Sequence, residues 1–294
     1  MDTSLYVANE SIMAVTGSAG KNAVTVQKFQ SVPLPTGSVI NGIITDERAF
    51  TEAMGALREQ MGGKLGNLKL VLGSSQIYTK RGVVPKLPRK KVLELVVNEF
   101  SDVDSGDDEL IYDYAVLGDL GADKGNAALL CAVKKSLVAA YADLLGGMKL
   151  HLTGMSMTHE AFFKLARLLP KTRESTFILL DFDGNTLDAI LFVSGEFRFS
   201  NRTRLIAERG TAESAGEILR VLSSLIQFNA SERSGQTITN VYLVGAVDKE
   251  LPLAERIHTS LDLPTEELTD TDGVIKAGED FRLSAYACAV GNLI

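Results

Sequence analysis

Two aspartates and a threonine stand close together around one predicted turn, and their side chains could hold a phosphate group or a metal-bound water. They belong to residues 176–200, which read TFILLDFDGNTLDAILFVSGEFRFS. Asp181 and Asp183 end the first apolar run, and Gly184 and Thr186 follow in the turn. Successive backbone amides in such a turn can form a concave site for an anion. An ordinary hairpin turn explains the same residues, so this segment alone leaves both interpretations open.

A β-meander must position these side chains. Residues 177–182, 187–193 and 196–200 are predicted strands, because apolar runs alternate with turn residues such as Gly and Asn that tolerate positive φ. A second meander is predicted at the start of the chain, with strands at residues 5–7, 11–16 and 23–29. The glycines and lysine at 17–21 lack the spacing of a phosphate-binding loop and are predicted to form a hairpin turn. Two meanders, each followed by helices, indicate two halves built on one plan.

The composition predicts an ordinary globular protein. Of 294 residues, 45% are hydrophobic and 23% are charged, which excludes a disordered or fibrous chain. The net charge of -7 argues against nucleic acid as the main partner, because phosphate backbones bind basic surfaces. Cys131 and Cys288 lie in apolar runs, as expected of buried thiols in a reducing compartment. The N-terminus lacks a basic, apolar signal and no apolar run reaches about 20 residues, so a cytoplasmic location is expected.

Metal-binding patterns are weak in this sequence. His151, His159 and His258 each lack a Cys, His or acid at ligand spacing, so His159 is predicted to be a packing or capping residue. The acidic run at 101–109 lacks the ligand pattern of a calcium loop. A basic group at 86–91 could meet acidic lipid headgroups or an acidic partner segment, or be a solvated face. No zinc or calcium site is predicted.

The remaining segments suggest an inserted unit between the two halves. Apolar spacing predicts helices at 46–61, 135–145, 156–169, 212–229, 249–261 and 281–293, and another that ends at Phe100. Strands are predicted at 68–72, 110–117, 127–133 and 149–153, and in the run NVYLVGA at 240–246, whereas residues 262–280 are predicted to be irregular. Residues 68–148 would form an inserted α+β subdomain, and the polar residues 170–175 would separate the halves.

The order of these segments resembles the actin-like ATPase superfamily, and most closely its type IV pilus assembly branch, the PilM family. The resemblance covers nearly the whole chain. It is carried by the segments YVANESIMAV, VPLPTGSVINGIITD, VLGSSQIYTKRGVVPKLP, IYDYAVL, ALLCAVKKSLVAAYADLL, LLDFDGNTLDAILFVSGEFRFS, TNVYLVGA and AYACAVGNL.

The resemblance implies an α/β fold of the actin-like, ribonuclease H-like type, with two lobes around a nucleotide cleft. Residues 1–67 and 149–172 would form the first lobe (1A), residues 68–148 a 1C-type insertion, and residues 173–294 the second lobe (2A). The last helix, 281–293, is a candidate to pack back toward the first lobe. The short interval between Phe199 and Val241 predicts that the 2B subdomain, one wall of the adenine pocket, is missing.

The family's phosphate and adenosine motifs are altered in this chain. The first motif needs an Asp, a Gly, small hydroxyl residues and a Lys, but the corresponding positions hold Tyr6, Ala8, Asn9, Glu10, Ser11 and Met13. In the second motif Asp181 matches, but Asp183 replaces a glycine, and a second carboxylate there repels phosphate unless a cation intervenes. In the adenosine motif Gly245 is followed by alanine instead of glycine. The candidate nucleotide-contacting residues are Asn9, Ser11, Asp181, Asp183, Gly184, Thr186 and Gly245.

These departures predict a scaffold that does not hydrolyse ATP. No catalytic residue, metal site or bound cofactor is expected, although the resemblance implies ATP or ADP with Mg²⁺. The resemblance also implies a cytoplasmic protein at the inner face of the membrane. Its expected partners are the N-terminal peptide of a PilN-like inner-membrane protein, held in a groove beside the insertion, and pilus motor ATPases. A GspL-like secretion component, an FtsA-like division protein and a still-active actin-like ATPase are the alternatives.

Overall fold

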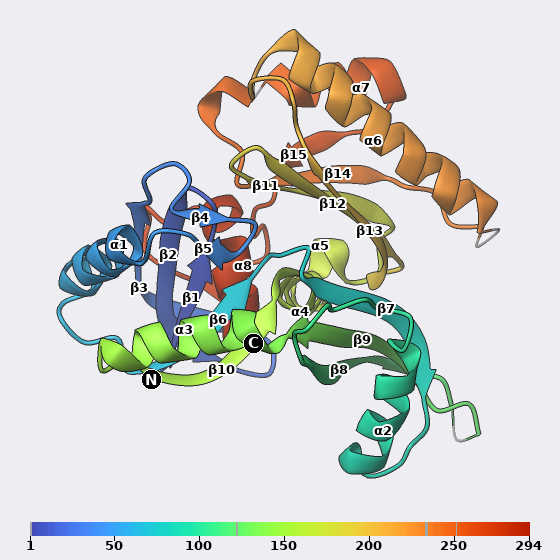
Figure 1. The fold of residues 1–294 in the computed structure, drawn as a ribbon. Helices are drawn as coiled ribbons and strands as arrows, with labels where there is room; N and C mark the ends of the chain where they lie inside the picture. The colour runs from blue at the N-terminus through green and yellow to red at the C-terminus, as the bar shows by residue number, and fades with distance from the viewer. Residues whose placement is uncertain (1, 122, 233–234, 251) are drawn as a thin grey trace.

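Two meanders begin the two larger sheets of the molecule (Figure 1). The computed structural model describes residues 2–121, 123–232, 235–250 and 252–294. The six-stranded sheet has the order β10 (His151–Met157), β6 (Asn67–Leu72), β1 (Asp2–Val7), β2 (Ser11–Ala19), β3 (Val24–Pro33) and β16 (Ile275–Lys276). The five-stranded sheet has the order β13 (Glu196–Arg204), β12 (Thr186–Val193), β11 (Phe177–Asp183), β14 (Asn240–Val244) and β15 (Thr265–Glu267). In each sheet the first strand of the meander also pairs with a later parallel strand, β6 or β14.

The local signals in the sequence place most of these strands and turns correctly. β11 is buried along its whole length, as its apolar run predicts, and its register with β12 pairs Asp183 with Thr186 across the turn. The predicted turn between β2 and β3 is present, with the Gly20 amide donating to the Ala23 carbonyl over 2.8 Å. β2 and β3 are longer than predicted, because their outer ends pair with each other beyond the buried part.

Eight α-helices of the described residues cover or connect the sheets. They are α1 (Glu47–Gln60), α2 (Arg89–Glu99), α3 (Lys135–Gly147), α4 (Thr158–Leu168), α5 (Pro170–Arg173), α6 (Ala212–Ser231), α7 (Pro252–Leu261) and α8 (Leu283–Leu293). The predicted cap of α1 is confirmed, because the Asp46 carboxylate accepts from the Ala49 amide over 2.9 Å. α7 begins later than predicted, since a 3₁₀ turn, Asp248–Glu250, precedes it. The tail that we predicted as irregular contains β15 and β16.

A separate three-stranded sheet, β7 (Ile77–Val84), β9 (Asn126–Lys134) and β8 (Leu110–Asp119), carries α2 on one face. This unit, lower right in Figure 1, is smaller than the predicted insertion at 68–148. β6 belongs to the six-stranded sheet, and α3 buries Tyr141 in the same core as Phe50. β7 was not predicted as a strand, because its half-exposed, polar-rich sequence hides the alternation expected of a strand. A short β4 (Val39–Ile40) and β5 (Ile43–Ile44) form a hairpin elsewhere.

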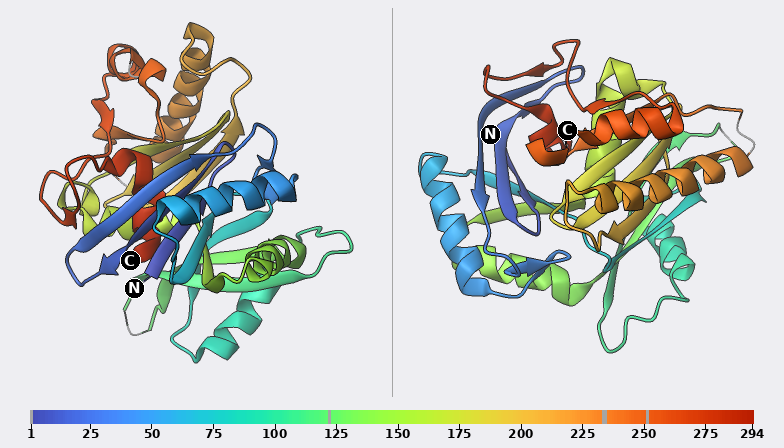
Figure 2. Two further views of the ribbon diagram at one scale, coloured as in Figure 1. Left: turned by 90° about the vertical axis from the view of Figure 1, so that its left-hand side faces the viewer. Right: turned by 90° about the horizontal axis from the view of Figure 1, so that it is seen from above.

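The last helix, α8, lies against the six-stranded sheet and α4 (Figure 2). The Asn292 side chain donates to the Ser4 hydroxyl at 3.0 Å and to the Lys69 carbonyl at 3.1 Å. A Cβ at Gly291 would stand 2.1 Å from the Ala161 carbonyl oxygen, so α8 and α4 approach closely only because this residue is glycine. The Gly245 amide also donates to the Ser284 carbonyl at 3.0 Å. α8 therefore bridges the two larger sheets.

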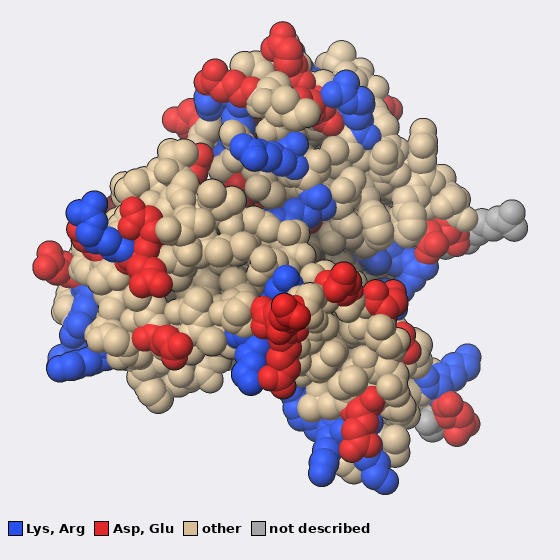
Figure 3. Space-filling view, viewed as in Figure 1, with Lys and Arg blue, Asp and Glu red and all other residues tan. Residues whose placement is uncertain are grey.

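The face of the molecule in Figure 3 mixes charges of both signs. Blue Lys and Arg side chains alternate there with red Asp and Glu side chains over all three sheet units. Several of the basic residues near the insertion are paired, as Lys86 is with Asp119 at 2.7 Å. No helix in the described ranges is both long enough and apolar enough to cross a lipid bilayer.

Candidate functional site

The turns of the two meanders meet and hydrogen-bond to each other. The Asn9 amide, between β1 and β2, donates to Asp183 Oδ1 at the end of β11 over 2.5 Å. The Asn9 side chain donates to the Asp183 carbonyl at 3.2 Å and to the Thr186 hydroxyl at 3.5 Å. The fold therefore brings the candidate residue Asn9 into contact with Asp183 and Thr186, which lie 174 and 177 positions away in the sequence.

A cavity of about 220 Å³ lies beside this contact. Ser11, Asp181, Asp183, Gly184 and Gly245 line it, whereas Asn9 and Thr186 form the contact between the turns. The other lining residues are Tyr6, Ala8, Glu10, Met13, Phe182, Arg209, Val244, Val247, Ala285 and Cys288. We call this cavity the cleft. Its walls come from both larger sheets and from α8.

Burial raises the pKa of both aspartates in the cleft. Burial raises the pKa of Asp181 well above its usual range, and the charges of Asp183 and Asp188 raise it further. Asp181 Oδ2 has no hydrogen-bond partner among the described residues. Burial also raises the pKa of Asp183, although the Asn9 amide and the Arg202 guanidinium oppose it. The Glu10 side chain lies against Gly184 at the rim. An added phosphate would therefore meet acidic groups.

Arg209 is the one basic residue among the described residues that line the cleft, and the sequence analysis did not single it out. Its Nε donates to Glu250 Oε1 at 2.7 Å, and its other nitrogens donate to the carbonyls of Gly184 at 3.0 Å and Gly245 at 3.1 Å. Both charged side chains are buried, with 10% of Arg209 and 2% of Glu250 exposed. Glu250 compensates the charge of Arg209, and the guanidinium ties together the two loops predicted to hold phosphate and adenosine.

A second buried charge cluster lies between α4 and β12. Arg202 stands 3.6 Å from a carboxylate oxygen of Asp183 and 3.6 Å from one of Asp188. His159 Nε2 is 3.2 Å from Asp188 Oδ2, and its ring packs edge-on against Phe197 at 5.5 Å. Burial raises the pKa of Asp188, but His159 and Arg202 together outweigh burial and hold it below its usual value. His159 is thus a packing residue with a charged partner, as predicted, and the described residues contain no His, Cys and acid cluster able to hold a metal ion.

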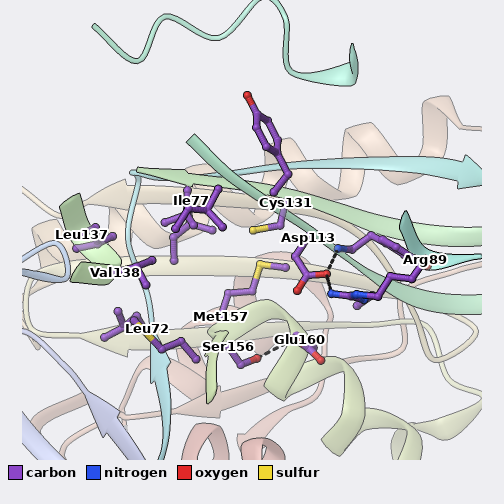
Figure 4. A pocket seen from close by; sticks show the side chains of 16 residues that line it. Leu72, Ile77, Arg89, Asp113, Cys131, Leu137, Val138, Ser156, Met157 and Glu160 are labelled. Atoms are coloured by element: carbon purple, nitrogen blue, oxygen red, sulfur yellow. Dashed lines mark hydrogen bonds and ion pairs between the residues drawn. The ribbon is translucent and has the colours of Figure 1, made fainter. Parts of the chain in front are cut away.

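A larger hollow of about 430 Å³ separates the three-stranded sheet from the six-stranded sheet (Figure 4). We call it the groove. It is lined by Leu72, Ile77, Arg89, Ile111, Tyr112, Asp113, Tyr114, Ala115, Cys131, Val133, Leu137, Val138, Met155, Ser156, Met157 and Glu160. Apolar side chains such as Ile77, Leu137 and Val138 fill one end, and the Arg89–Asp113 ion pair lies at the other.

Two strand edges border this groove. β8 and β10 stand at the ends of their sheets in the strand order of the described residues. Five consecutive residues of β8, 111–115, line the groove, and so do three of β10, 155–157. Side chains of consecutive strand residues point to opposite faces, so a ligand that reaches all of them must lie along the strand edge. The groove therefore runs along two strand edges, a shape that suits an extended chain.

Comparison with known proteins identifies the family. The family model described as type IV pilus assembly protein PilM matches residues 5–199. This chain belongs to the PilM family. The match extends from β1 into β13 and includes the groove and the meander turns of the cleft. A search of curated proteins found no match.

Solved structures show the same fold. The structure described as the PilM-PilN type IV pilus biogenesis complex is 16% identical, covers 99% of this chain and 97% of its own, and superposes with a TM-score of 0.82. A Bacteroides thetaiotaomicron protein with an actin-like ATPase fold has 9% identity, 93% coverage of both chains and a TM-score of 0.56. The cytoplasmic domain of EpsL from the Vibrio cholerae type II secretion system has 11% identity, covers 99% of this chain and 93% of its own, and has a TM-score of 0.50. This PilM family member has the actin-like ATPase fold.

Proposed function

We propose that this PilM family member is a scaffold that docks the N-terminal peptide of a PilN-like inner-membrane protein in its groove. The observation that carries the proposal is the groove itself, bordered by the edges of β8 and β10. At about 3.3 Å per residue, the five groove residues of β8 would accompany about 16 Å of extended peptide. Main-chain hydrogen bonds to a strand edge give affinity, and the apolar end supplies side-chain pockets.

Two properties of the groove support this occupant. Its apolar end, with Leu137 and Val138, suits apolar side chains of a peptide. The similar solved structure is described as a complex of PilM with PilN, which supports a PilN-like partner. Such docking would hold the protein at the inner face of the membrane, within reach of pilus motor ATPases.

Titration calorimetry with a synthetic N-terminal peptide of the organism's PilN-like protein tests the proposal. Val138→Arg places a charge at the apolar end and is expected to weaken binding at least tenfold, about 1.4 kcal/mol. Leu95→Arg is the matched control, because Leu95 is exposed on α2 and does not line the groove. The affinity of the Leu95→Arg variant for the peptide should stay within twofold of the wild-type affinity. Equal binding of a scrambled peptide, or equal losses in the two variants, would refute docking in the groove.

We further propose that the cleft does not hold a triphosphate tightly and that the protein does not hydrolyse ATP. Asp183 occupies the phosphate-motif turn and already accepts a hydrogen bond from the Asn9 amide, which would otherwise face a phosphate. Arg209 is paired with Glu250 and cannot offset phosphate charge without leaving it buried and unpaired. Calorimetry with ATP and ADP in the presence of Mg²⁺ tests this part. Micromolar binding, or release of phosphate faster than in buffer, would refute it.

A further inference from the structure

The connector between β6 and β7, residues 73–76, touches both the cleft and the groove. Leu72 and Ile77, the residues that flank it, line the groove. On its other side the Gly73 carbonyl accepts a hydrogen bond from Arg202 at 3.4 Å. The same guanidinium stands 3.6 Å from the Asp183 carboxylate, which lines the cleft. The Arg202 side chain therefore links Asp183 in the cleft to the connector that precedes β7.

A second path reaches the connector through the turn between β4 and β5. The Asn41 amide donates to Asn9 Oδ1 at 2.7 Å, and the Asn9 amide in turn donates to Asp183. The Asn41 side chain then donates to the Ser75 hydroxyl at 2.5 Å and accepts from the Ser75 amide at 2.9 Å. Asp183, Asn9, Asn41 and Ser75 thus form a continuous chain of hydrogen bonds, which we call the relay.

The turn that carries the relay is fixed in position. Asn41 and Gly42 both have positive φ, 51° and 77°. A Cβ on Gly42 would lie 2.9 Å from the Gly73 carbonyl oxygen, so the turn packs directly on the connector. The Gly42 carbonyl accepts from the Tyr141 hydroxyl at 2.8 Å, and Tyr141 belongs to α3, which supplies Leu137 to the groove. A shift of the turn must therefore move two walls of the groove.

We propose that the relay couples the cleft to the groove, so that a ligand in the groove and the contact between Asn9 and Asp183 influence each other. The identity of the groove's ligand rests on the function proposed above, but the coupling is a property of the chain alone. A ligand that moves Ile77 must move the connector and change its hydrogen bonds to Asn41 and Arg202. Thermodynamic linkage makes the coupling free energy reciprocal, so the factor by which a groove ligand changes the equilibrium of the Asn9–Asp183 contact is also the factor by which that contact changes the affinity of the groove for its ligand.

The two native cysteines allow a direct test in the full chain. Cys131 lines the groove and Cys288 lines the cleft, so their alkylation rates, resolved by mass spectrometry at constant pH, report on each site. Asn41→Gly removes the relay side chain and keeps a residue that accepts positive φ. Asp262→Gly is the matched control, because Asp262 also has positive φ, 54°, and lies between α7 and β15.

We expect Asn41→Gly to change the alkylation rate of Cys131 by about fivefold or more, at the lower end of typical coupling, and Asp262→Gly to change it less than twofold. Arg202→Gln should also change the Cys131 rate, with Arg204→Gln on the same strand as its control. In the Asn41→Gly background the effect of Arg202→Gln should shrink, because both act on one connector. Ser75→Ala, which spares the turn, replaces Asn41→Gly if circular dichroism shows that the latter is unfolded.

The outcomes separate the two proposals. If the alkylation rates of Cys131 in all relay variants match those of the control variants, the coupling is refuted, even if the protein binds the peptide. If the relay variants change the alkylation rate of Cys131 but the wild-type protein binds no PilN-like peptide, the coupling is supported and the proposed ligand is refuted. If both proposals hold, peptide binding should slow alkylation of Cys131 and change that of Cys288 in the wild type, and the change at Cys288 should shrink in Asn41→Gly, in which only the path through Arg202 remains.

Discussion

The buried ion pair between Arg209 and Glu250 offers the most direct test of how the cleft is held together. Arg209→Leu leaves the Glu250 carboxylate buried with only 2% exposure and without its partner. It also removes the hydrogen bonds that join the Gly184 and Gly245 carbonyls. Breaking a buried pair at one side costs about 3–5 kcal/mol, because the remaining charge stays desolvated. We therefore expect Arg209→Leu to lower the free energy of unfolding by that amount.

Urea unfolding followed by circular dichroism measures this loss, and two further variants make the test specific. The double variant Arg209→Leu with Glu250→Leu should recover most of the stability, since replacing a whole buried pair by apolar residues is often neutral. Lys249→Ala removes the neighbouring exposed pair with Glu208, 3.5 Å long, and should cost less than about 1 kcal/mol. A loss below 1 kcal/mol for Arg209→Leu, or a double variant less stable than the single one, would refute the reasoning.

Further predictions concern glycines and buried acids. Gly195→Ala should be among the most destabilising substitutions in a thermal scan, because φ is 74° and the new Cβ would stand 1.8 Å from the Arg173 carbonyl oxygen. Gly216→Ala, in α6 with open space around it, should instead stabilise by about 0.5–1 kcal/mol. The folded-state pKa of Asp181 is raised above its ordinary value of 3.8. The stability that this shift contributes is therefore fully present below pH 3.8 and is lost as the pH rises through the raised pKa. Asp181→Asn should therefore be at least as stable as the wild type at pH 7, and a lower stability there would contradict the burial argument. The pKa of Asp188 is lowered, so its stabilisation is present above 3.8 and is lost as the pH falls through the lowered folded-state pKa. Asp188→Asn should destabilise at pH 7 and lose its effect in strong acid, as urea unfolding at a series of pH values can show.

Local signals in the sequence were enough to predict the framework of the fold. The apolar run of β11 and the turn at Gly184 gave the central meander, and Asp46 gave the start of α1. These features depend on neighbouring residues, for which propensity and periodicity are informative. The order of segments then gave the family, which the match over residues 5–199 confirms.

Features that depend on contacts distant in sequence could not be predicted. Nothing near Arg202 or Arg209 in the sequence indicates what each guanidinium will contact, because their partners at 73 and 250 lie far along the chain. The bounds of the insertion were too wide for the same reason, since a strand such as β6 reveals its sheet only through pairing. β7 was missed because one face of an edge strand can be polar.

The structure explains Asp183, which the sequence analysis identified only as a replacement for the glycine of the second phosphate motif. A carboxylate at this position was predicted to repel phosphate. In the structure it accepts the Asn9 amide, 174 positions away, and thereby closes the two meander turns on each other. The departure from the family motif therefore has a structural use, which no local pattern could reveal.

The position of α8 has a consequence for biosynthesis. β1 belongs to the six-stranded sheet, and α8, which covers part of that sheet, follows β1 by almost the whole described chain, so β1 is synthesised well before α8. Until α8 has emerged from the ribosome, the apolar side chains that later contact Val290 and Leu293 have no cover. Nascent chains should therefore expose this apolar sheet face until α8 is available to cover it, and chaperones that bind such surfaces should associate with them during that time.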